Sequence, residues 1–540
     1  MTTQTPVDAA GKAPEPTSTA APGKGLRGHP WLTLFSVAIG VMMVALDGTI
    51  VAVANPAITK DLGASLADVQ WITNGYLLAL AVALITAGKL GDRFGHRQTF
   101  LIGVVGFAAA SGAIGLSGTV SLVIAFRVLQ GLFGALLMPA ALGLLRATFP
   151  AEKLNMAIGI WGMVIGASTA GGPILGGVLV EHVSWQSVFF INVPVGAVAL
   201  VLGLLILKDH RAENAPRSFD IPGIALLSAA MFALIWALIK AGDPWGWGSG
   251  KTWAFLGASV VCFALFAFWE TRVKEPLIPL GLFRSVPLSA GTALMVLMAF
   301  AFMGGLFFVT FYLQNVHGMS PVDSGLHLLP LTAMMIVSSP VAGALITRFG
   351  PRIPLVGGMV STAVAMFGMT TLDRDTGTLP MSVWLALLGL GLAPVMVGAT
   401  EVIVGNAPLE LSGVAGGLQQ AGMQVGGSLG TAVLGAVMSN TVDGDLAGNW
   451  KDAGLPGDPP PGLDKAAATG MVPEEMAKAP GVTGSTFDKI TGAVHDTFIS
   501  GMGVAFAVAG VVGVLAALIA TLTKRGANAD AAGASGGGHI

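Results

Sequence analysis

Charged residues are scarce in this sequence and make up only 10% of its 540 residues. A soluble domain carries about 25%, so they are too few to cover a water-facing surface of this size. The 27 basic and 29 acidic side chains nearly cancel to a net charge of −2, which excludes the basic surface of a nucleic-acid-binding protein. Cys262 is the single cysteine, so no intrachain disulfide can form, and its apolar neighbours indicate simple packing.

Motifs for catalysis, metal binding or a cofactor are also missing. The sequence has neither a His/Cys cluster with metal-ligand spacing nor a nucleophile elbow. Residues 248–252 resemble the end of a phosphate-binding loop, but Trp245 stands where that loop requires its first glycine. We therefore expect neither an enzyme nor a bound metal or cofactor.

Apolar residues, 54% of the chain, come instead in long runs such as 101–124, 195–207 and 504–520. A helix needs about 20 apolar residues to cross a bilayer, and lipid permits only helices or closed barrels. The runs predict an all-α integral membrane protein with fourteen transmembrane helices, at 31–53, 70–88, 99–117, 120–145, 155–180, 187–207, 221–240, 253–270, 288–312, 326–347, 353–371, 380–404, 412–438 and 498–522.

Positive charge predicts how these spans are oriented. Lys and Arg follow even-numbered spans, as at Arg93 and Arg97 after the second and at Arg348 and Arg352 after the tenth. Because short cytoplasmic loops are enriched in Lys and Arg, we expect both termini in the cytoplasm and a multi-pass protein of the cell membrane. Residues 1–28 are predicted to be a disordered tail, 524–540 a second cytoplasmic tail, and the Pro- and Gly-rich connection 440–495 a mobile outer loop.

The chain contains an internal repeat. Residues 88–97 align without a gap on residues 343–352, with six of ten positions identical. Both copies lie in a short connection between two predicted spans. The repeat predicts two related six-helix halves, 29–210 and 286–523, with two linker helices inserted within 211–285. Two similar halves around a site at the midplane are the architecture of rocking transporters.

Four motifs in this order resemble the major facilitator superfamily, and within it the fourteen-span drug:proton antiporters. The first runs from Leu46 through Asp47 to Pro56, the second is the turn at 88–97, the third is 127–131, and the fourth is a Gly-Pro set in the fifth span. The resemblance covers about residues 31–522 without the outer loop. The sequence departs from it in three places, at Ser168, in the outer turn 185–187, and at Thr347, which replaces the acid that matches Asp92.

Asp47 and Arg127 are the candidates for proton coupling. An Asp in the middle of a span costs about 2.5–3.5 kcal/mol on insertion scales, and burial favours its neutral form, as a proton carrier requires. Arg127 cannot readily deprotonate, so it needs a partner, and Asp47 is the candidate. The resemblance also implies proton transfer at both residues. The alternatives are an Asp47 that bonds Thr49 or a helix backbone for packing, and an Arg127 that is a static ion-pair anchor or that snorkels near the outer surface.

The turn after the second span is a candidate conformational latch. Its carboxylate, Asp92, could bond the N-terminus of a neighbouring helix in one state of the transporter and release it in the other. The arginines of this turn would in any case fix the topology. The latch residues are Gly88, Asp92, Arg93, Gly95 and Arg97.

The fifth span carries small residues that allow close helix packing and a proline that bends it. We interpret this set as an antiporter hinge, with a generic packing face as the alternative; it comprises Gly162, Gly166, Gly172, Pro173, Gly176 and Gly177. A second polar set could line a substrate cavity or form helix–helix hydrogen bonds, and its acid could be solvated near the membrane surface. This set comprises Asn74, Tyr76, Glu401, Gln419, Gln420 and Gln424.

These observations predict proton-driven efflux of small amphipathic or apolar organic compounds by alternating access. The expected partners are a drug-like substrate, protons and the lipid bilayer, with no nucleic acid, and the protein is expected to act as a monomer. Two alternatives stay open. One is an importer or facilitator of a nutrient or metabolite with the same fold, and the other is a non-transporting membrane sensor.

Overall fold

Helices form all of the regular structure in the computed structural model, which describes residues 26–64, 66–208, 220–242, 245–472, 476 and 483–524. Within these residues no strand occurs, and fourteen helical segments are long and apolar enough to cross a membrane. This confirms the predicted all-α fold and the number of spans. The predicted tails, 1–28 and 524–540, lie almost wholly outside the described residues.

The N-terminal half contains the first six spans, and a short helix and its successor form the sixth. Its helices are α1 (Pro30–Leu62), α2 (Leu66–Phe94), α3 (His96–Gly115), α4 (Val120–Thr148), α5 (Ala151–His182), α6 (Ser187–Phe190) and α7 (Asn192–Ile206). Two linker helices follow, α8 (Ile221–Gly242) and α9 (Gly250–Glu270).

The C-terminal half repeats this arrangement with additional short helical turns. Its elements are η1 (Leu280–Arg284), α10 (Val286–Phe311), the π-helical turn η2 (Tyr312–Val316), α11 (Pro321–His327), α12 (Leu329–Phe349), α13 (Arg352–Met369), α14 (Thr378–Gly405), η3 (Leu409–Leu411), α15 (Ser412–Asp452), α16 (Leu463–Ala467) and α18 (Gly484–Ala520).

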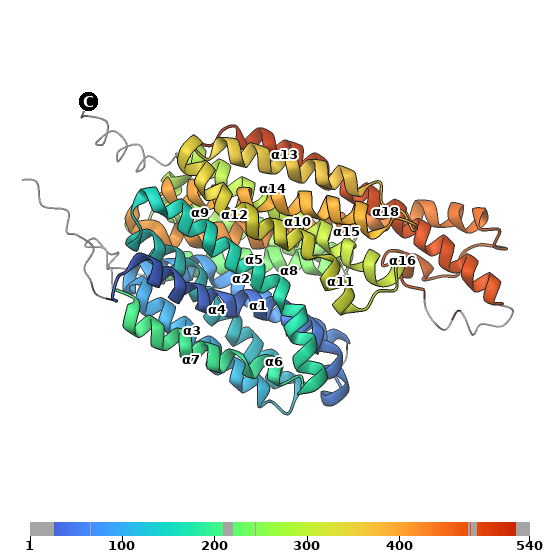
Figure 1. Cartoon of the computed structure of the whole chain (residues 1–540), viewed down its shortest axis with the longest axis horizontal. Helices are drawn as coiled ribbons and strands as arrows, with labels where there is room; N and C mark the ends of the chain where they lie inside the picture. Colours follow the sequence, from blue (N-terminus) through green and yellow to red (C-terminus); the bar gives the residue numbers. More distant parts are fainter. Residues whose placement is uncertain are drawn as a thin grey trace, which may run out of the picture.

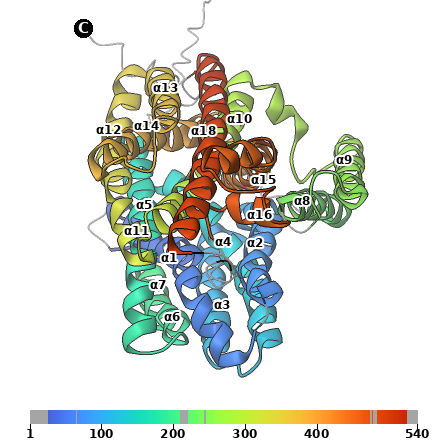
Figure 2. The ribbon, with the colours of Figure 1, turned by 90° about the vertical axis from the view of Figure 1, so that its right-hand side faces the viewer.

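The two halves lie side by side with their helices along the long axis of the molecule (Figure 1). The linker helices α8 and α9 lie at one edge of the bundle, where α8 contacts α2 and α15 (Figure 2). α1 begins and α18 ends at the same end of the bundle (Figure 1), as an even number of spans requires.

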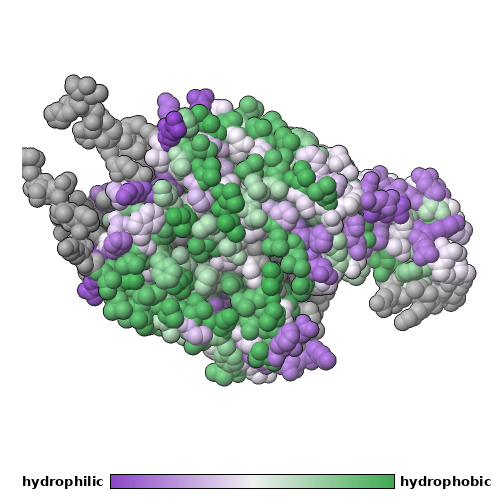
Figure 3. All heavy atoms as spheres, viewed as in Figure 1, coloured by the Kyte–Doolittle hydropathy of each residue, from purple (hydrophilic) through white to green (hydrophobic). Residues whose placement is uncertain are grey.

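The surface of the bundle is apolar along its sides. On the face shown in Figure 3, hydrophobic residues cover the flank and hydrophilic residues collect toward the two ends. Large apolar side chains face outward even on the linker helix α9, where Val260 is 68% and Phe268 59% exposed. An apolar flank of this kind has to be surrounded by lipid.

Both turns of the internal repeat have the same backbone conformation. Gly95 between α2 and α3 has a φ of 98°, and Gly350 between α12 and α13 has a φ of 82°. Residues with a Cβ rarely adopt a positive φ, which explains a glycine at this position in both copies. The shared conformation supports the predicted relation between the two halves.

The outer connection differs from its prediction as a mobile loop over 440–495. α15 continues to Asp452 and α18 begins at Gly484. The continuation is held by packing and polar contacts, because Trp450 is buried and Asn449 Nδ2 donates to Thr497 Oγ1 at 2.9 Å. The predicted span ended at residue 438 because hydropathy falls there. The fall marks where α15 leaves the apolar part of the membrane, and the helix itself continues to Asp452. Within the connection, 473–475 and 477–482 lie outside the described residues.

Candidate functional site

Asp47 of α1 and Arg127 of α4 form an ion pair inside the N-terminal half. Arg127 Nη1 lies 2.5 Å from Asp47 Oδ2, and both side chains are buried. The contact confirms that Asp47 is the partner of Arg127, as the sequence predicted. A charge inside a span has to be compensated, and here each charge compensates the other.

Two amides that the sequence analysis did not single out complete this site. Gln130 Oε1 accepts from Arg127 Nη1 at 2.7 Å, and Gln130 Nε2 donates to Asp47 Oδ1 at 2.9 Å. Asn192 Nδ2 lies 3.4 Å from the same Oδ1 and donates to Ser111 Oγ at 3.0 Å. Gln130 follows Arg127 by three residues, which places both on one helix face, so this spacing could have identified it.

The remaining contacts of Arg127 fix the position of its guanidinium. Arg127 Nε donates to the carbonyl oxygen of Ile72 at 3.0 Å, and Arg127 Cζ lies 4.0 Å from the ring centroid of Tyr76. This is a cation–π distance, so Tyr76 belongs to the ion-pair site. Thr49 does not bond Asp47 but donates to the carbonyl oxygens of Leu46 and Thr169, which removes one packing alternative for Asp47.

Hydrogen-bond donors make the polar contacts of the Asp47 carboxylate among the described residues. The hydrogen bonds from Arg127, Gln130 and Asn192 are all donated to the ionised form of Asp47. Protonation of the carboxylate would remove the charge that holds α1 against α4 at this point. In a water-poor interior, losing one partner of a buried ion pair is worth about 3–5 kcal/mol.

Asp92 joins the two halves at the end of α2. Its carboxylate accepts the backbone N–H of Gly413 at 2.8 Å and of Val414 at 3.0 Å, both in the first turn of α15. His96 Nε2 lies 3.3 Å from Asp92 Oδ1 and 3.3 Å from Ser412 Oγ. A carboxylate at a helix N-terminus is stabilised by unpaired N–H groups and by the helix dipole. The contact predicted for Asp92 is therefore present.

The glycines of the turn allow this contact. A methyl group on Gly88 would overlap the carbonyl oxygen of Gly413, so α2 and α15 touch backbone to backbone. The arginines of the turn make further contacts: Arg93 Cζ lies over the Phe94 ring, and Arg97 Nη2 donates to the carbonyl oxygen of Leu204.

Two basic residues missed by the sequence analysis add contacts near the latch. Arg146 Nη2 donates to the carbonyl oxygen of Ala407 at 2.6 Å and so joins α4 to the C-terminal half. Lys89 Nζ donates to the carbonyl oxygen of Pro276 at 2.8 Å and so joins α2 to the segment after the linker helices. The sequence indicates these two residues only through the general enrichment of Lys and Arg after even-numbered spans.

The second copy of the repeat makes a weaker version of the same junction. A Cβ on Gly343 of α12 would lie 2.7 Å from the carbonyl oxygen of Asn155 in α5. Asn155 Nδ2 is 3.5 Å from Thr347 Oγ1, at the position that matches Asp92. The two halves thus meet through related glycines on both sides, but the second junction has Thr347 at the position of the Asp92 carboxylate.

The glycines of α5 separate into two groups. Gly172 and Gly176 pack against Thr49 and Ile50 of α1, with no room for a Cβ at Gly172. Gly162, Gly166 and Gly177 instead face α11, α12 and α14 of the other half, and a Cβ on each would meet only atoms at 3.5–3.9 Å. Close packing therefore applies to the first group only. α5 continues through Pro173 as one helix, and the side chain of Pro173 lies outside the described part.

The predicted cavity residues do not lie in one place. Gln419 and Gln420 are buried on α15, and Gln419 Oε1 and Gln420 Nε2 have no hydrogen-bond partner in the described residues. Gln424 on the same helix is half-buried. Glu401 on α14 is buried, so the solvated position considered for it is wrong. Asn74 lies on a different face of α2 from Tyr76, in a pocket beside α8.

Two related halves of membrane-spanning helices, with a buried ion pair in one half and glycine junctions between them, define a membrane transporter and not an enzyme. The sequence profile of the Major Facilitator Superfamily matches residues 37–431, and the chain belongs to this family. The human organic anion transporter MFSD10 has a similar fold, with a TM-score of 0.60 at 11% identity over 91% of this chain and 99% of the other.

Two relatives agree with the resemblance to drug exporters. The tetracenomycin C resistance and export protein of Streptomyces glaucescens is 65% identical over 515 residues, which cover 95% of this chain and 95% of the relative. The multidrug resistance protein Stp of Mycobacterium tuberculosis (strain CDC 1551 / Oshkosh) is 35% identical over 409 residues, 76% of each chain.

Proposed function

We propose that this protein exports small amphipathic or apolar organic compounds, antibiotics among them, in exchange for protons. The Asp47–Arg127 pair carries the proposal, because it places a carboxylate inside a span with a partner that keeps its own proton. Loading and unloading of Asp47 would change the attraction between α1 and α4. A transporter can couple a proton gradient to rocking of its halves through such a change.

The orientation follows from the distribution of basic residues. We place both termini and the Asp92 latch on the cytoplasmic side of the inner or plasma membrane, so the closed junction of α2 with α15 faces the cytoplasm. Protons then enter from outside, and the membrane potential adds about 2.3 kcal/mol per charge per 100 mV. We expect one chain to be sufficient for this cycle.

The substrate class is inferred from relatives whose names state resistance or export. We propose that this chain likewise removes an antibiotic from the cell that makes or meets it. The buried amides Gln419 and Gln420 on α15 and the indole N–H of Trp161 on α5 have polar atoms without partners in the described residues, and such groups suit a substrate that offers hydrogen bonds in an otherwise apolar cavity.

Inside-out membrane vesicles with a fluorescent drug as substrate test this proposal. We expect an imposed proton gradient to drive drug uptake into vesicles with the wild type and not with Asp47→Asn, which keeps the shape but cannot ionise. Asp61→Asn, near the C-terminal end of α1, is the matched control and should transport normally, because the amide oxygen can still accept from Trp185 Nε1. Gradient-driven transport by Asp47→Asn at equal expression would refute the coupling role, and movement in the opposite direction would indicate an importer.

A further inference from the structure

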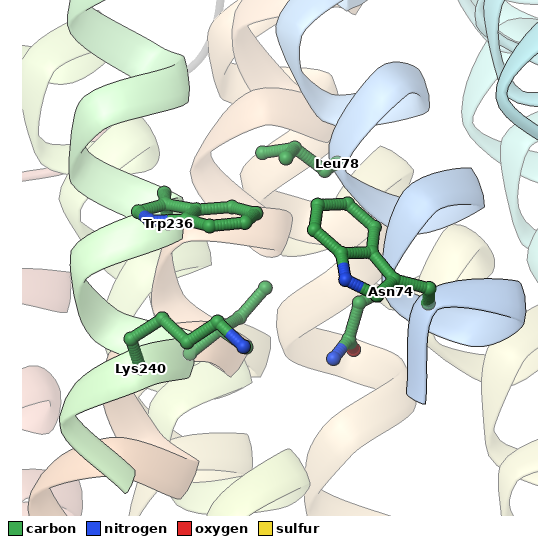
Figure 4. Close-up of a pocket in the computed structure, with 6 residues that line it drawn as sticks. Asn74, Leu78, Trp236 and Lys240 are labelled. Atoms are coloured by element: carbon green, nitrogen blue, oxygen red, sulfur yellow. The ribbon is translucent and has the colours of Figure 1, made fainter. Parts of the chain in front are cut away.

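The linker helices contact the N-terminal half at two levels. Near one end of α8, the ring of Trp236 packs on the ring of Trp71 of α2, with 5.0 Å between centroids, beside the narrow pocket shown in Figure 4. At the other end, Asp220 directly precedes α8 and faces Glu270, the last residue of α9. Asp220 is 6% and Glu270 5% exposed. Two acidic side chains are therefore buried together, away from the Asp47 site.

Glu270 holds the connection that leads from α9 to the C-terminal half. Its Oε1 accepts the backbone N–H of Leu277 and its Oε2 that of Ile278, both at 3.2 Å. The carbonyl oxygen of the preceding residue, Pro276, accepts from Lys89 Nζ of α2 at 2.8 Å. The carboxylate and the ammonium thus fasten the same three residues, 276–278, which we call the clamp segment.

The two oxygens of Asp220 have different surroundings. Asp220 Oδ1 accepts from Trp269 Nε1 at 2.7 Å and from the backbone N–H of Gly223 at 3.0 Å. Asp220 Oδ2 is buried, and no described residue donates to it. It lies with Glu270 Oε1 against Gly223, where a Cβ would overlap the first oxygen and lie 2.8 Å from the second. The absence of a side chain at Gly223 lets the two acids meet.

Two acids in this position need a proton between them. An ionised carboxyl group accepts hydrogen bonds but has none to donate, and two ionised carboxyl groups in one buried site repel each other. The other charged groups nearby are Lys89, which interacts with both acids and with Asp92, and Glu275 of the same connection. The single ammonium is directed at Pro276, so it does not replace a donor between the acids.

We propose that Asp220 and Glu270 bind one proton, between Asp220 Oδ2 and Glu270 Oε1, and that this proton keeps the linker helices closed on α2. With the proton in place, both oxygens of Glu270 remain available to the clamp segment. Without it, repulsion separates the start of α8 from the end of α9 and releases the segment. The site is a pH-sensitive clamp that does not depend on the proposed export function.

Hydrogen exchange of the Leu277 and Ile278 amides, in the full-length protein in nanodiscs, tests this proposal. Because the closed form binds the proton and the open form releases it to water, the clamp is complete at low pH and is lost as the pH rises. One proton changes the ratio of closed to open molecules by up to about tenfold for each pH unit. We therefore expect exchange, corrected for the intrinsic rate, to be about tenfold or more faster at about pH 9 than at about pH 6.

Two neutral substitutions should act in opposite ways. Asp220→Asn can place an amide N–H where the proton lies, so exchange should stay slow at both pH values. Glu270→Gln leaves one N–H of the clamp segment without an acceptor, so exchange should be fast at both. Glu275→Gln removes a carboxylate from the same connection and is the matched control, which should keep the wild-type response. Asp47→Asn should keep it too.

A pH response that persists in Asp220→Asn would overturn the proposal, as would equal exchange of the wild type at both pH values. Loss of the response in Glu275→Gln or Asp47→Asn would place the proton elsewhere and would overturn it as well. Drug transport is measured on the same preparations. A clamp response without any drug transport refutes the export function alone, whereas proton-driven transport without a clamp response refutes the clamp alone.

Discussion

Gly88 of α2 and Gly413 of α15 lie so close that a methyl group on either would overlap the carbonyl oxygen of the other. One turn further along α2, Asp92 accepts the N–H groups of Gly413 and Val414. Close backbone packing and the hydrogen bonds of Asp92 therefore hold the same pair of helices together at the same place. The junction can exist only while the two halves are closed at this end. This makes the junction sensitive to very small substitutions.

Gly88→Ala should open the junction. Overpacking costs about 1–3 kcal/mol, so the ratio of closed to open molecules should fall by about 5- to 150-fold. Spin labels are attached at Gln98→Cys and Glu410→Cys in a Cys262→Ser background. Electron paramagnetic resonance should then report a longer distance between the two labels in Gly88→Ala than in the protein without this substitution. Gly357→Ala is the control, because a Cβ on Gly357 meets nothing within 4 Å. An unchanged distance distribution in Gly88→Ala would show that the junction tolerates a side chain.

Asp92→Asn should weaken the same junction without a steric clash. The neutral amide can still accept one N–H but loses the charge that the helix N-terminus stabilises, a loss of about 0.3–2 kcal/mol. We expect the spin-label distance to lie between those of the wild type and Gly88→Ala, and we expect efflux to be slower. Asp92→Ala should change both quantities more than Asp92→Asn does. If Asp92→Ala closed as fully as the wild type, the carboxylate would not stabilise the junction.

The sequence was sufficient to predict the two charged contacts because charge is rare in these spans. Asp47 and Arg127 are isolated charges in apolar runs, and lipid requires them to find partners. Gln130 and Asn192 were not predicted, because a buried amide can be satisfied by a nearby backbone group as easily as by a distant carboxylate. The spacing of three residues places Gln130 on the same helix face as Arg127, but only the crossing of α1, α4 and α7 brings both amides to Asp47.

The sequence could not predict how far α15 extends or that a pocket lies between α2 and α8. Hydropathy measures how much of a helix is suited to lipid, so it missed the end of α15 near Trp450. Trp71 and Trp236 are separated by most of the N-terminal half, and nothing in their local patterns indicates that they meet. Asn74 was grouped with Tyr76 because the two are close in sequence, yet positions two apart on a helix do not share a face.

Gln130→Leu should destabilise the ion-pair site more than a surface change would. The substitution leaves Asp47 Oδ1 with one fewer donor and Arg127 Nη1 with one fewer acceptor, and an unmet buried group costs about 1–3 kcal/mol. We expect a lower Tm in detergent and slower efflux. Gln186→Leu, in the outer turn before α6, is the control, since the Gln186 amide makes a longer hydrogen bond, to Asp61 Oδ2 at 3.4 Å. Equal Tm values for the two variants would argue that Gln130 does not support the pair.

His317 provides a pH dependence outside the spans. It follows the π-helical turn Tyr312–Val316, and its ring lies 4.7 Å from that of Tyr312. Burial lowers the pKa of His317, and His327 lowers it further. The folded segment therefore favours the neutral ring, so its stability is complete above the ordinary histidine pKa of about 6.5 and is lost as the pH falls through the lower, folded value.

Acid should therefore loosen this segment, and hydrogen exchange of residues 317–328 can measure it. We expect faster exchange at about pH 5 than at neutral pH, after correction for the intrinsic rate, because the open form takes up the proton more readily. His317→Phe keeps a ring beside Tyr312 but cannot titrate, so it should flatten this dependence. His182→Phe, at an exposed site on α5, should leave it unchanged. An acid response that persists in His317→Phe would assign the effect to other groups, of which His327 is the nearest histidine in sequence.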